Sequence, residues 1–167
     1  MNDKKVRKLI YSAMLAALVT AATMVVKIPS PTNGYVNLGD CFVLLAGWLL
    51  GPWYGGAAAG IGSMLTDLLS GYAYYAPASF VIKGLDAIVA ALLYRSLKQS
   101  RGGLLLSGIV GELIMAAGYF GYSALLLGKG LGAALSIPGN LVQGAVGIIA
   151  AIMLLHLAKR AHLTEKI

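Results

Sequence analysis

The stretch Asn33-Gly34-Tyr35-Val36-Asn37-Leu38-Gly39-Asp40 is a polar, glycine-bearing loop that stands between two long apolar segments. A lipid bilayer offers no water to backbone polar groups, so irregular chain close to it must face water, protein or a ligand. The apolar segments on both sides therefore predict a membrane protein. The position of the loop predicts that it covers a solute site.

The composition of the chain supports the membrane class. Of its 167 residues, 59% are hydrophobic and 11% are charged, whereas a soluble domain carries about 25% charged residues. The length accommodates one bundle of roughly five to seven spans, each needing about 20 apolar residues. The single cysteine, Cys41, excludes an internal disulfide and a multi-cysteine metal site, and we expect it to be buried.

The order of apolar runs and breaks predicts one all-α domain over residues 1–167, a bundle of six transmembrane helices. Pro29 and Pro31 end the first run, because proline cannot continue a helical ladder. That run has no A-x-A-like cleavage site, so we expect a retained span and not a signal peptide. The spans are expected at about residues 8–28, 40–50, 53–70, 77–97, 103–127 and 131–160, the last with a break near Pro138.

The net charge of +7 lies in short clusters that flank the apolar runs, which indicates membrane orientation and not nucleic-acid binding. Six spans place both termini on one side, and the excess of basic residues predicts that this side is the cytoplasm. The loops at residues 30–39, 71–76 and 128–136 then face outward, flanked only by Lys27 and Lys129. The basic residues expected inside are Lys4, Lys5, Arg7, Lys8, Arg95, Lys98, Arg101, Lys159, Arg160 and Lys166.

Small residues form the second pattern. Glycines cluster at residues 55–62 and 144–147, and we expect packing faces there, because helices in lipid associate by close backbone approach. Ala13, Ala17 and Ala21 recur at every fourth position and form one smooth stripe on the first helix. The stripe is either an internal packing face or a docking groove for the helices of a partner.

Taken together, these features resemble the substrate-binding S components of energy-coupling factor (ECF) vitamin transporters. The resemblance covers nearly the whole chain and is closest to the hydroxymethylpyrimidine and pyridoxine branch, which shades into the riboflavin type. Five motifs in their order and spacing carry it: Ala13-x-x-x-Ala17, Tyr35-Val36-Asn37-Leu38-Gly39-Asp40, Leu49-Leu50-Gly51-Pro52, Thr66-Asp67-Leu68-Leu69-Ser70-Gly71-Tyr72 and Tyr75-Ala76-Pro77-Ala78-Ser79-Phe80-Val81-Ile82-Lys83-Gly84.

The resemblance implies a six-helix bundle in a prokaryotic plasma membrane, which binds one vitamin from outside with the first external loop as a lid. It also implies assembly with a transmembrane coupling subunit of the EcfT type, which the alanine stripe would face, and with two cytoplasmic ATPases. The chain has no G-x-x-x-x-G-K-S/T phosphate loop, so we expect ATP hydrolysis in the partners and no cofactor here.

Ionisable residues within the spans indicate a structural or functional role, since inserting each charged side chain at the membrane centre costs ~2.5–3.5 kcal/mol. Lys83 and Asp86 are three residues apart on one helix, so they form an ion pair or one of them meets the ligand. Glu112 is a candidate ligand contact or a partner of Lys83. Asp40 begins a helix, where a carboxylate is expected to cap free amides, and Asp67 is expected to be structural.

Amides and aromatic side chains complete the expected site. Asn140 and Gln143 share a helix face, and amides both donate and accept hydrogen bonds. Tyrosines supply stacking faces and hydroxyl groups. No metal site is expected, because His156 and His162 do not share a helix face. The predicted substrate-binding residues are Tyr35, Asn37, Lys83, Glu112, Tyr119, Asn140 and Gln143.

The function predicted from these features is binding of vitamin B6 (pyridoxine or pyridoxamine) or of hydroxymethylpyrimidine, without catalysis. The alternatives are a riboflavin-type S component and a proton-coupled secondary carrier driven by Glu112, although carriers often show internal repeats and none is visible. A membrane enzyme using Asp67, Asp86 and Glu112 would lack a metal-binding histidine pair and a nucleophile elbow.

Overall fold

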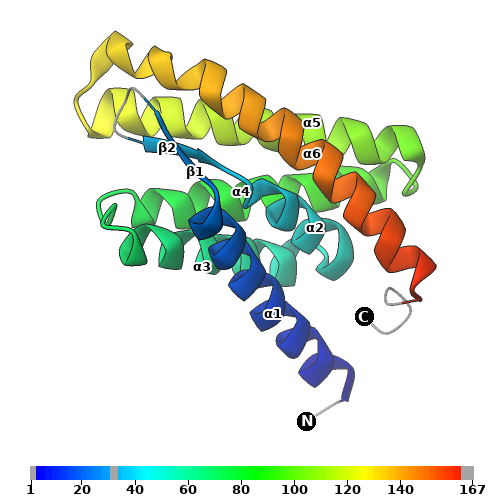
Figure 1. Cartoon of the computed structure of the whole chain (residues 1–167). Coiled ribbons are helices and arrows are strands. Elements are labelled where there is room, and N and C mark those ends of the chain that lie inside the picture. Colours follow the sequence, from blue (N-terminus) through cyan, green and yellow to red (C-terminus); the bar gives the residue numbers. More distant parts are fainter. Residues whose placement is uncertain (1–2, 31–33, 163–167) are drawn as a thin grey trace.

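The computed structural model describes residues 3–30 and 34–162, with side chains for residues 4–26 and 37–162. The described chain is almost entirely helical, as the sequence predicts (Figure 1). Its elements are α1 (Asp3–Val25), β1 (Lys27–Ser30), β2 (Gly34–Asn37), α2 (Asp40–Leu50), α3 (Pro52–Leu69), α4 (Ala76–Ser96), α5 (Arg101–Gly121), the π-helical turn η1 (Tyr122–Leu126), the 3-10 helix η2 (Gly130–Ser136) and α6 (Ile137–Arg160).

Within the described residues, four helical segments are long and apolar enough to cross a membrane, at Lys4–Val25, Ala76–Ser96, Arg101–Leu126 and Gly130–Arg160. Helix α2 has 11 residues, which makes it about 16 Å long, against a hydrocarbon core of ~30 Å. Nine of those residues are buried, so α2 is enclosed by protein. The prediction of six full spans is therefore not confirmed, and α2 and α3 do not meet the length and apolarity of a span.

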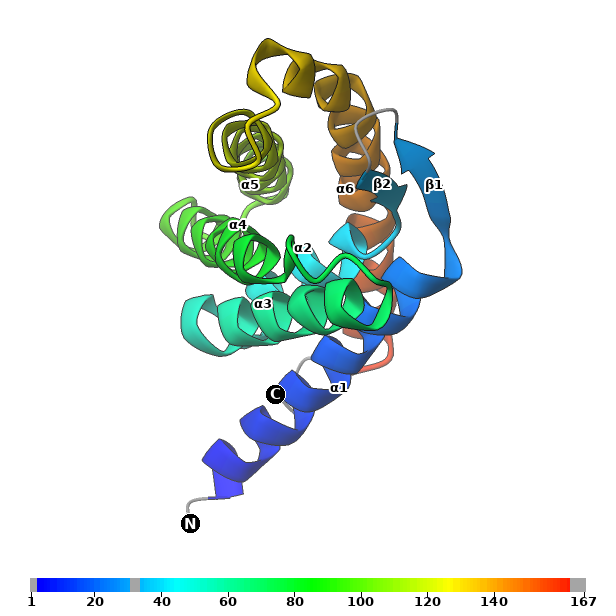
Figure 2. The same cartoon turned by 90° about the vertical axis from the view of Figure 1, so that its left-hand side faces the viewer.

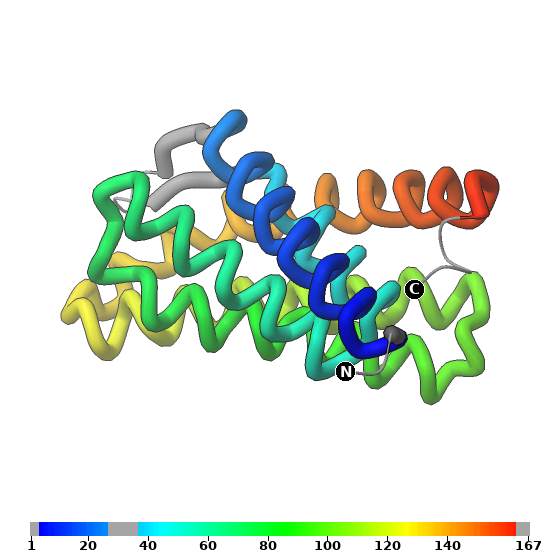
Figure 3. Tube along the Cα trace, turned by 90° about the horizontal axis from the view of Figure 1, so that it is seen from below, coloured from blue at the N-terminus to red at the C-terminus, as the bar shows by residue number. Residues whose placement is uncertain are grey.

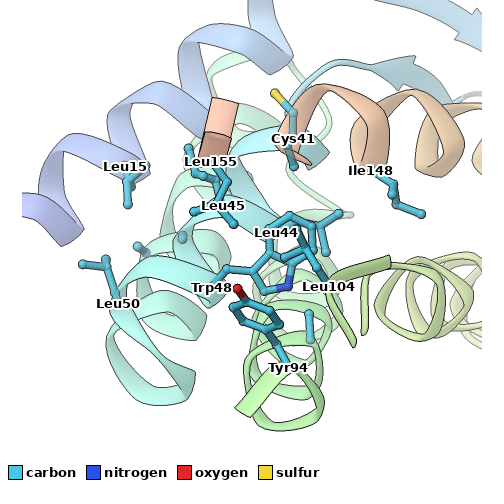
Figure 4. Packing of buried hydrophobic residues seen from close by; sticks show 14 of the residues in the cluster. Leu15, Cys41, Leu44, Leu45, Trp48, Leu50, Tyr94, Leu104, Ile148 and Leu155 are labelled. Atoms are coloured by element: carbon cyan, nitrogen blue, oxygen red, sulfur yellow. The ribbon is translucent and has the colours of Figure 1, made fainter. Parts of the chain in front are cut away.

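The core of the bundle forms around the buried face of α2. Leu44 and Trp48 of this helix pack against Leu104 of α5 and Tyr94 of α4 (Figure 4). The indole nitrogen of Trp48 donates to Ser107 Oγ over 3.1 Å, which satisfies its polar group inside the core. Cys41 is buried in the same cluster, as the sequence predicts.

The glycine clusters are helix-packing faces, as predicted. A Cβ atom on Gly55 of α3 would lie 2.4 Å from the Ala46 carbonyl oxygen of α2, and one on Gly62 would lie 2.5 Å from the Ala16 carbonyl oxygen of α1. On α6, a Cβ on Gly147 would lie 2.8 Å from Asp40 Cβ. Only glycine permits these approaches, which hold α1, α2, α3 and α6 close together.

The two ends of the bundle differ. The α3–α4 turn and the α5–α6 connection lie at one end, and the α4–α5 connection lies at the other with the start of α1 and the end of α6 (Figures 1 and 3). The β1–β2 hairpin lies at the first end (Figure 1). The basic residues group as predicted, although Lys166 lies outside the described residues and the cytoplasmic assignment of the terminal end stays a prediction.

The polar loop is more regular than expected. Strands β1 and β2 pair antiparallel, with Lys27 opposite Asn37 and Pro29 opposite Tyr35. Helix α1 accordingly ends at Val25, three residues before the predicted end, because the chain turns into an extended strand. Both strands of a two-stranded ribbon are edge strands, where proline is tolerated. The expected break near Pro138 is the junction of η2 with α6, where Pro138 occupies the first turn.

A glycine substitution tests the packing of α3 on α2. We expect Gly55→Ala to lower the melting temperature in detergent, since a new Cβ would meet the backbone of α2 and overpacking costs about 1–3 kcal/mol. Gly121→Ala is the matched control, because a Cβ on this helical glycine meets nothing within 4 Å. A Gly55→Ala protein as stable as the Gly121→Ala protein would contradict this packing.

Candidate functional site

A polar cavity is lined by residues from all six α-helices and from strand β2. Figure 2 shows α3, α4 and α5 on one side of the bundle, α6 and the hairpin on the other, and α2 between them. Its empty volume, which includes open space at the mouth, is about 640 Å³. Every described lining residue has a polar side chain: Thr23, Asn37, Asp40, Ser63, Asp67, Tyr75, Ser79, Lys83, Tyr119, Ser123, Ser136, Asn140 and Gln143.

The Asp40 carboxylate is the centre of the polar network in this wall. One of its oxygens forms an ion pair with Lys83 of α4, and the other accepts a hydrogen bond of 2.7 Å from the Gln143 amide of α6. Asp40, Lys83 and Gln143 are exposed by only 1%, 3% and 3%. A charge so deeply buried requires this pairing, so the network fixes α2 against α4 and α6.

The network continues from Gln143 into the hairpin. The backbone N–H of Asn37 donates to Gln143 Oε1 over 2.7 Å, and the Asn37 side chain donates to the same oxygen over 3.3 Å. Asn37 Oδ1 in turn accepts from the backbone N–H of Gly39 over 2.7 Å. Strand β2 is therefore tied to α6 at the residue that enters the cavity wall.

Two tyrosines form the aromatic part of the wall. The rings of Tyr75 and Tyr119 meet edge to face, with centroids 6.2 Å apart and an interplanar angle of 67°. Their hydroxyls pair with Ser123 and Ser79 over 2.9 Å and 2.8 Å. Lys83 Nζ lies 5.7 Å from the centroid of Tyr119, so this ring is held by a hydroxyl and by a cation at once.

Asn140 differs from the other amides of the wall. Its side chain lines the cavity and is half-buried, and it makes no hydrogen bond to any other residue that the structure describes. Both ends of the Gln143 amide, by contrast, are engaged by Asp40 and Asn37. The Asn140 amide is thus a donor and acceptor that a bound molecule can use.

Five of the predicted site residues meet in the cavity wall, namely Asn37, Lys83, Tyr119, Asn140 and Gln143. Glu112 does not line it: this side chain is buried between α5 and α6, where it packs on Gly144 and Gly147. Tyr35 lies in β2, and its side chain is outside those that the structure describes.

Neither ion pair that the sequence suggests for Lys83 forms, and the predicted cap at Asp40 is wrong. Lys83 pairs with Asp40 and with neither Asp86 nor Glu112. Asp40 makes no capping bond, since Gly39 is the N-cap residue of α2 and has no side chain to cap it. The carboxylate turns inward because Lys83 and Gln143 reach it from neighbouring helices, and such partners leave no local signal in the sequence.

Sequence reasoning also missed most of the hydroxyl groups in the wall. Serine and threonine inside apolar helices are common packing residues, so nothing local marks the ones that face a cavity. Asp67, expected to be structural, lies in the wall as well. The lining residues outside the predicted substrate-binding set are Thr23, Asp40, Ser63, Asp67, Tyr75, Ser79, Ser123 and Ser136.

A comparison with protein families identifies the bundle. The profile described as "ECF-type riboflavin transporter, S component" matches residues 3–160, almost the whole chain. The chain belongs to this S-component family. It is accordingly a helical membrane protein of a family whose members are the substrate-binding subunits of transporters.

Known proteins similar to this S component cover most of its length. One is the thiamine precursor transporter HmpT of Lactococcus lactis subsp. cremoris (strain MG1363), 28% identical over 163 residues, which are 96% of this chain and 92% of that one. Another, from Pyrococcus woesei, is described as an "Uncharacterized protein in gap 3'region" and is 37% identical over 132 residues, 78% of this chain and 87% of its own.

A solved structure shows the same fold. It is described as "Structure and mechanism of the S component of a bacterial ECF transporter" and superposes with a TM-score of 0.68 at 23% identity. The match covers 94% of this chain and 98% of the other. At this identity the likeness concerns the arrangement of the helices.

A second, apolar groove lies between α1 and α3. Ala13, Ala17 and Ala21 are exposed, so the stripe does not pack inside the bundle. Ala13 lines the groove, and docking of a partner at the stripe stays a prediction. The groove residues are Leu9, Ser12, Ala13, Ala16, Trp53, Tyr54, Ala57, Ala58 and Ile61.

A double-mutant cycle tests the buried pair of Lys83 and Asp40. We expect Lys83→Met or Asp40→Asn alone to destabilise the protein by about 3–5 kcal/mol, because each leaves the other charge buried without its partner. The double variant removes both charges and should be more stable than the sum of the single losses implies. Unfolding in detergent measures this, and strictly additive losses would contradict the pairing.

Proposed function

We propose that this S component binds a small heteroaromatic vitamin or vitamin precursor, either hydroxymethylpyrimidine or vitamin B6 in the form of pyridoxine or pyridoxamine. The observation that carries the proposal is the all-polar lining of the cavity, with one pair of aromatic rings and the uncommitted amide of Asn140. A single ring that bears amino and hydroxymethyl groups matches such a lining, since each substituent finds a donor or an acceptor.

Riboflavin is the second candidate, because the matching family profile carries its name. Its three fused rings and their methyl groups would need a broad apolar wall. Among the described lining residues no side chain is aliphatic, and only Tyr75 and Tyr119 offer ring faces. The similarity to a thiamine precursor transporter also favours the smaller ring.

The hairpin acts as the lid in this proposal. Asn37 belongs both to β2 and to the cavity wall, and it is held on α6 through Gln143. Release of this contact would let the strand leave α6 while the remaining wall stays in place. With the termini in the cytoplasm, the hairpin end faces outward, so the solute enters from outside.

Transport would require partners. The chain contains no phosphate-binding loop for ATP, so we propose assembly with an EcfT-type coupling subunit and two ECF ATPases in a prokaryotic plasma membrane. The exposed stripe of Ala13, Ala17 and Ala21 beside the α1–α3 groove would receive the helices of the coupling subunit. Small side chains suit such a contact, because they permit close helix approach in lipid.

A binding screen with the purified protein, without partners, tests the proposed function. The ligands are hydroxymethylpyrimidine, pyridoxine, pyridoxamine, thiamine and riboflavin, titrated by calorimetry in detergent. We expect one-to-one binding of hydroxymethylpyrimidine or of a B6 vitamin. Failure of every ligand to bind would contradict the proposal, and solute flux through the lone protein in liposomes would favour a secondary carrier.

Substitution of Asn140 tests the position of the site. We expect Asn140→Ala to weaken binding of the ligand found in the screen by about 1–3 kcal/mol, the cost of an unmet buried hydrogen bond, or about 5- to 150-fold in Kd. The neighbouring Leu141→Ala is the control, because Leu141 is exposed on the outer face of α6. Equal affinities of the two variants would place the ligand elsewhere.

A tryptophan substitution tests the docking stripe. We expect Ala17→Trp to abolish co-purification with the coupling subunit and the ATPases while it leaves vitamin binding unchanged, because the bulky ring blocks helix approach outside the bundle. Ala117→Trp is the control, since Ala117 is also an exposed helical alanine, on α5. Loss of assembly in both variants, or in neither, would contradict the assignment of this surface.

A further inference from the structure

Three buried carboxyl groups surround one buried ammonium group beside the cavity. Asp40, Asp86 and Glu112 are exposed by 1%, 0% and 5%, and Lys83 by 3%. Lys83 is committed to Asp40. Within the part of the chain that the structure describes, no donor reaches either oxygen of Asp86 or of Glu112. The burial of the Asp86 and Glu112 carboxyl groups without a hydrogen-bond donor among the described residues therefore needs an explanation.

Glu112 meets Asp40 at a glycine of α6. A Cβ placed on Gly147 would lie 2.8 Å from Asp40 Cβ and 3.3 Å from Glu112 Oε1, so both side chains border the same glycine. The Glu112 carboxyl group therefore lies next to Asp40 inside the bundle. Two carboxylates have no proton to share, so this contact is favourable only when one of the groups is protonated.

The surroundings of Glu112 supply no other compensation. Helix α2 presents Asp40 to it, α4 presents Lys83 and Asp86, and α6 presents Gly144 and Gly147. The single cation in this set is already paired with Asp40. An additional carboxylate here would be an uncompensated charge inside the membrane, which is costly, and buried groups in such places neutralise.

We propose that Glu112 is a proton-binding positioning residue, which carries a proton at neutral pH and donates it to Asp40. Asp40 then receives partners from three other helices: Lys83 from α4, Glu112 from α5 and Gln143 from α6. The same network reaches Asn37 and the hairpin through Gln143. The effect of this proton on ligand binding rests on the proposed function. The protonation of Glu112 does not depend on it.

Ionisation of Glu112 would place a second negative charge beside Asp40. Repulsion between the two carboxylates would pull Asp40 away from Gln143, and the hold of Gln143 on Asn37 would weaken. The lid would then be less firmly closed at alkaline pH. This predicts ligand binding that depends on the proton of Glu112, without any contact between Glu112 and the ligand.

Infrared difference spectroscopy on the purified, ligand-free protein tests the proton directly. At neutral pH we expect Glu112→Gln to remove a carbonyl-stretch band of a protonated carboxylic acid, which lies well separated from the carboxylate bands. The neighbouring Asp86→Asn variant should retain that band. In the wild-type protein the band should vanish as the pH is raised. A spectrum in which Glu112 contributes only carboxylate bands at neutral pH would overturn the proposal.

The pH profile of binding tests the consequence, with hydroxymethylpyrimidine and pyridoxine as probes. We expect affinity in the wild type to fall about tenfold or more at alkaline pH, while Glu112→Gln, which keeps a neutral donor, shows a flatter profile. Glu112→Ala should bind weakly at every pH, and Asp86→Asn should follow the wild type. Identical profiles for wild type and Glu112→Gln would overturn the positioning role. If neither probe binds, the proposed function is contradicted, and the infrared spectrum still shows whether Glu112 carries a proton.

Discussion

The burial of one carboxylate constrains this protein more than any other single feature. Asp40 is the first residue of α2 and is almost completely enclosed. A charge in such a place is tolerated only with partners, and these come from α4 and α6 as Lys83 and Gln143. Because Asp40 follows directly on the hairpin, the same bonds decide where the hairpin enters the bundle. The position of the hairpin and the packing of three helices therefore depend on one group.

Close helix packing makes this arrangement possible. Helix α2 is too short to cross the bilayer, so other helices must surround it. Gly47 permits the approach of α4, where a Cβ would lie 2.5 Å from the Ala87 carbonyl oxygen, and Gly147 brings α6 against Asp40. The apolar residues around Trp48 hold the bundle together without using the polar groups near the hairpin. Those polar groups remain available to line a cavity.

The sequence predicts the parts of this structure that depend on local pattern. The membrane class follows from composition, the helices from apolar runs and breaks, and the packing faces from the glycine clusters at residues 55–62 and 144–147. Asn140 and Gln143 could be recognised as polar residues on one face of an apolar helix, and both line the cavity. In each case a few neighbouring residues carry the signal.

The parts that could not be predicted depend on contacts between distant segments. Lys83 and Asp40 are 43 residues apart, and Asp86, three residues from Lys83, is the partner that helix geometry suggests. The prediction that Glu112 lines the cavity is wrong, because helical periodicity gives the face of a residue but not the helix that covers it. Ser79 and Tyr75 resemble any packing serine or interfacial tyrosine until their partners are known. Long-range charge pairing, not local propensity, decides these positions.

The most direct test of this account is an experimental structure of the protein with the ligand that it binds most tightly. The account predicts the ligand between Tyr119 and Asn140, with Asp40 bonded to Lys83 and Gln143 and with Asn37 still on Gln143. A ligand bound outside this cavity would contradict the account. So would a ligand bound inside it in a structure where Asn37 has left Gln143 and Asp40 no longer contacts Lys83.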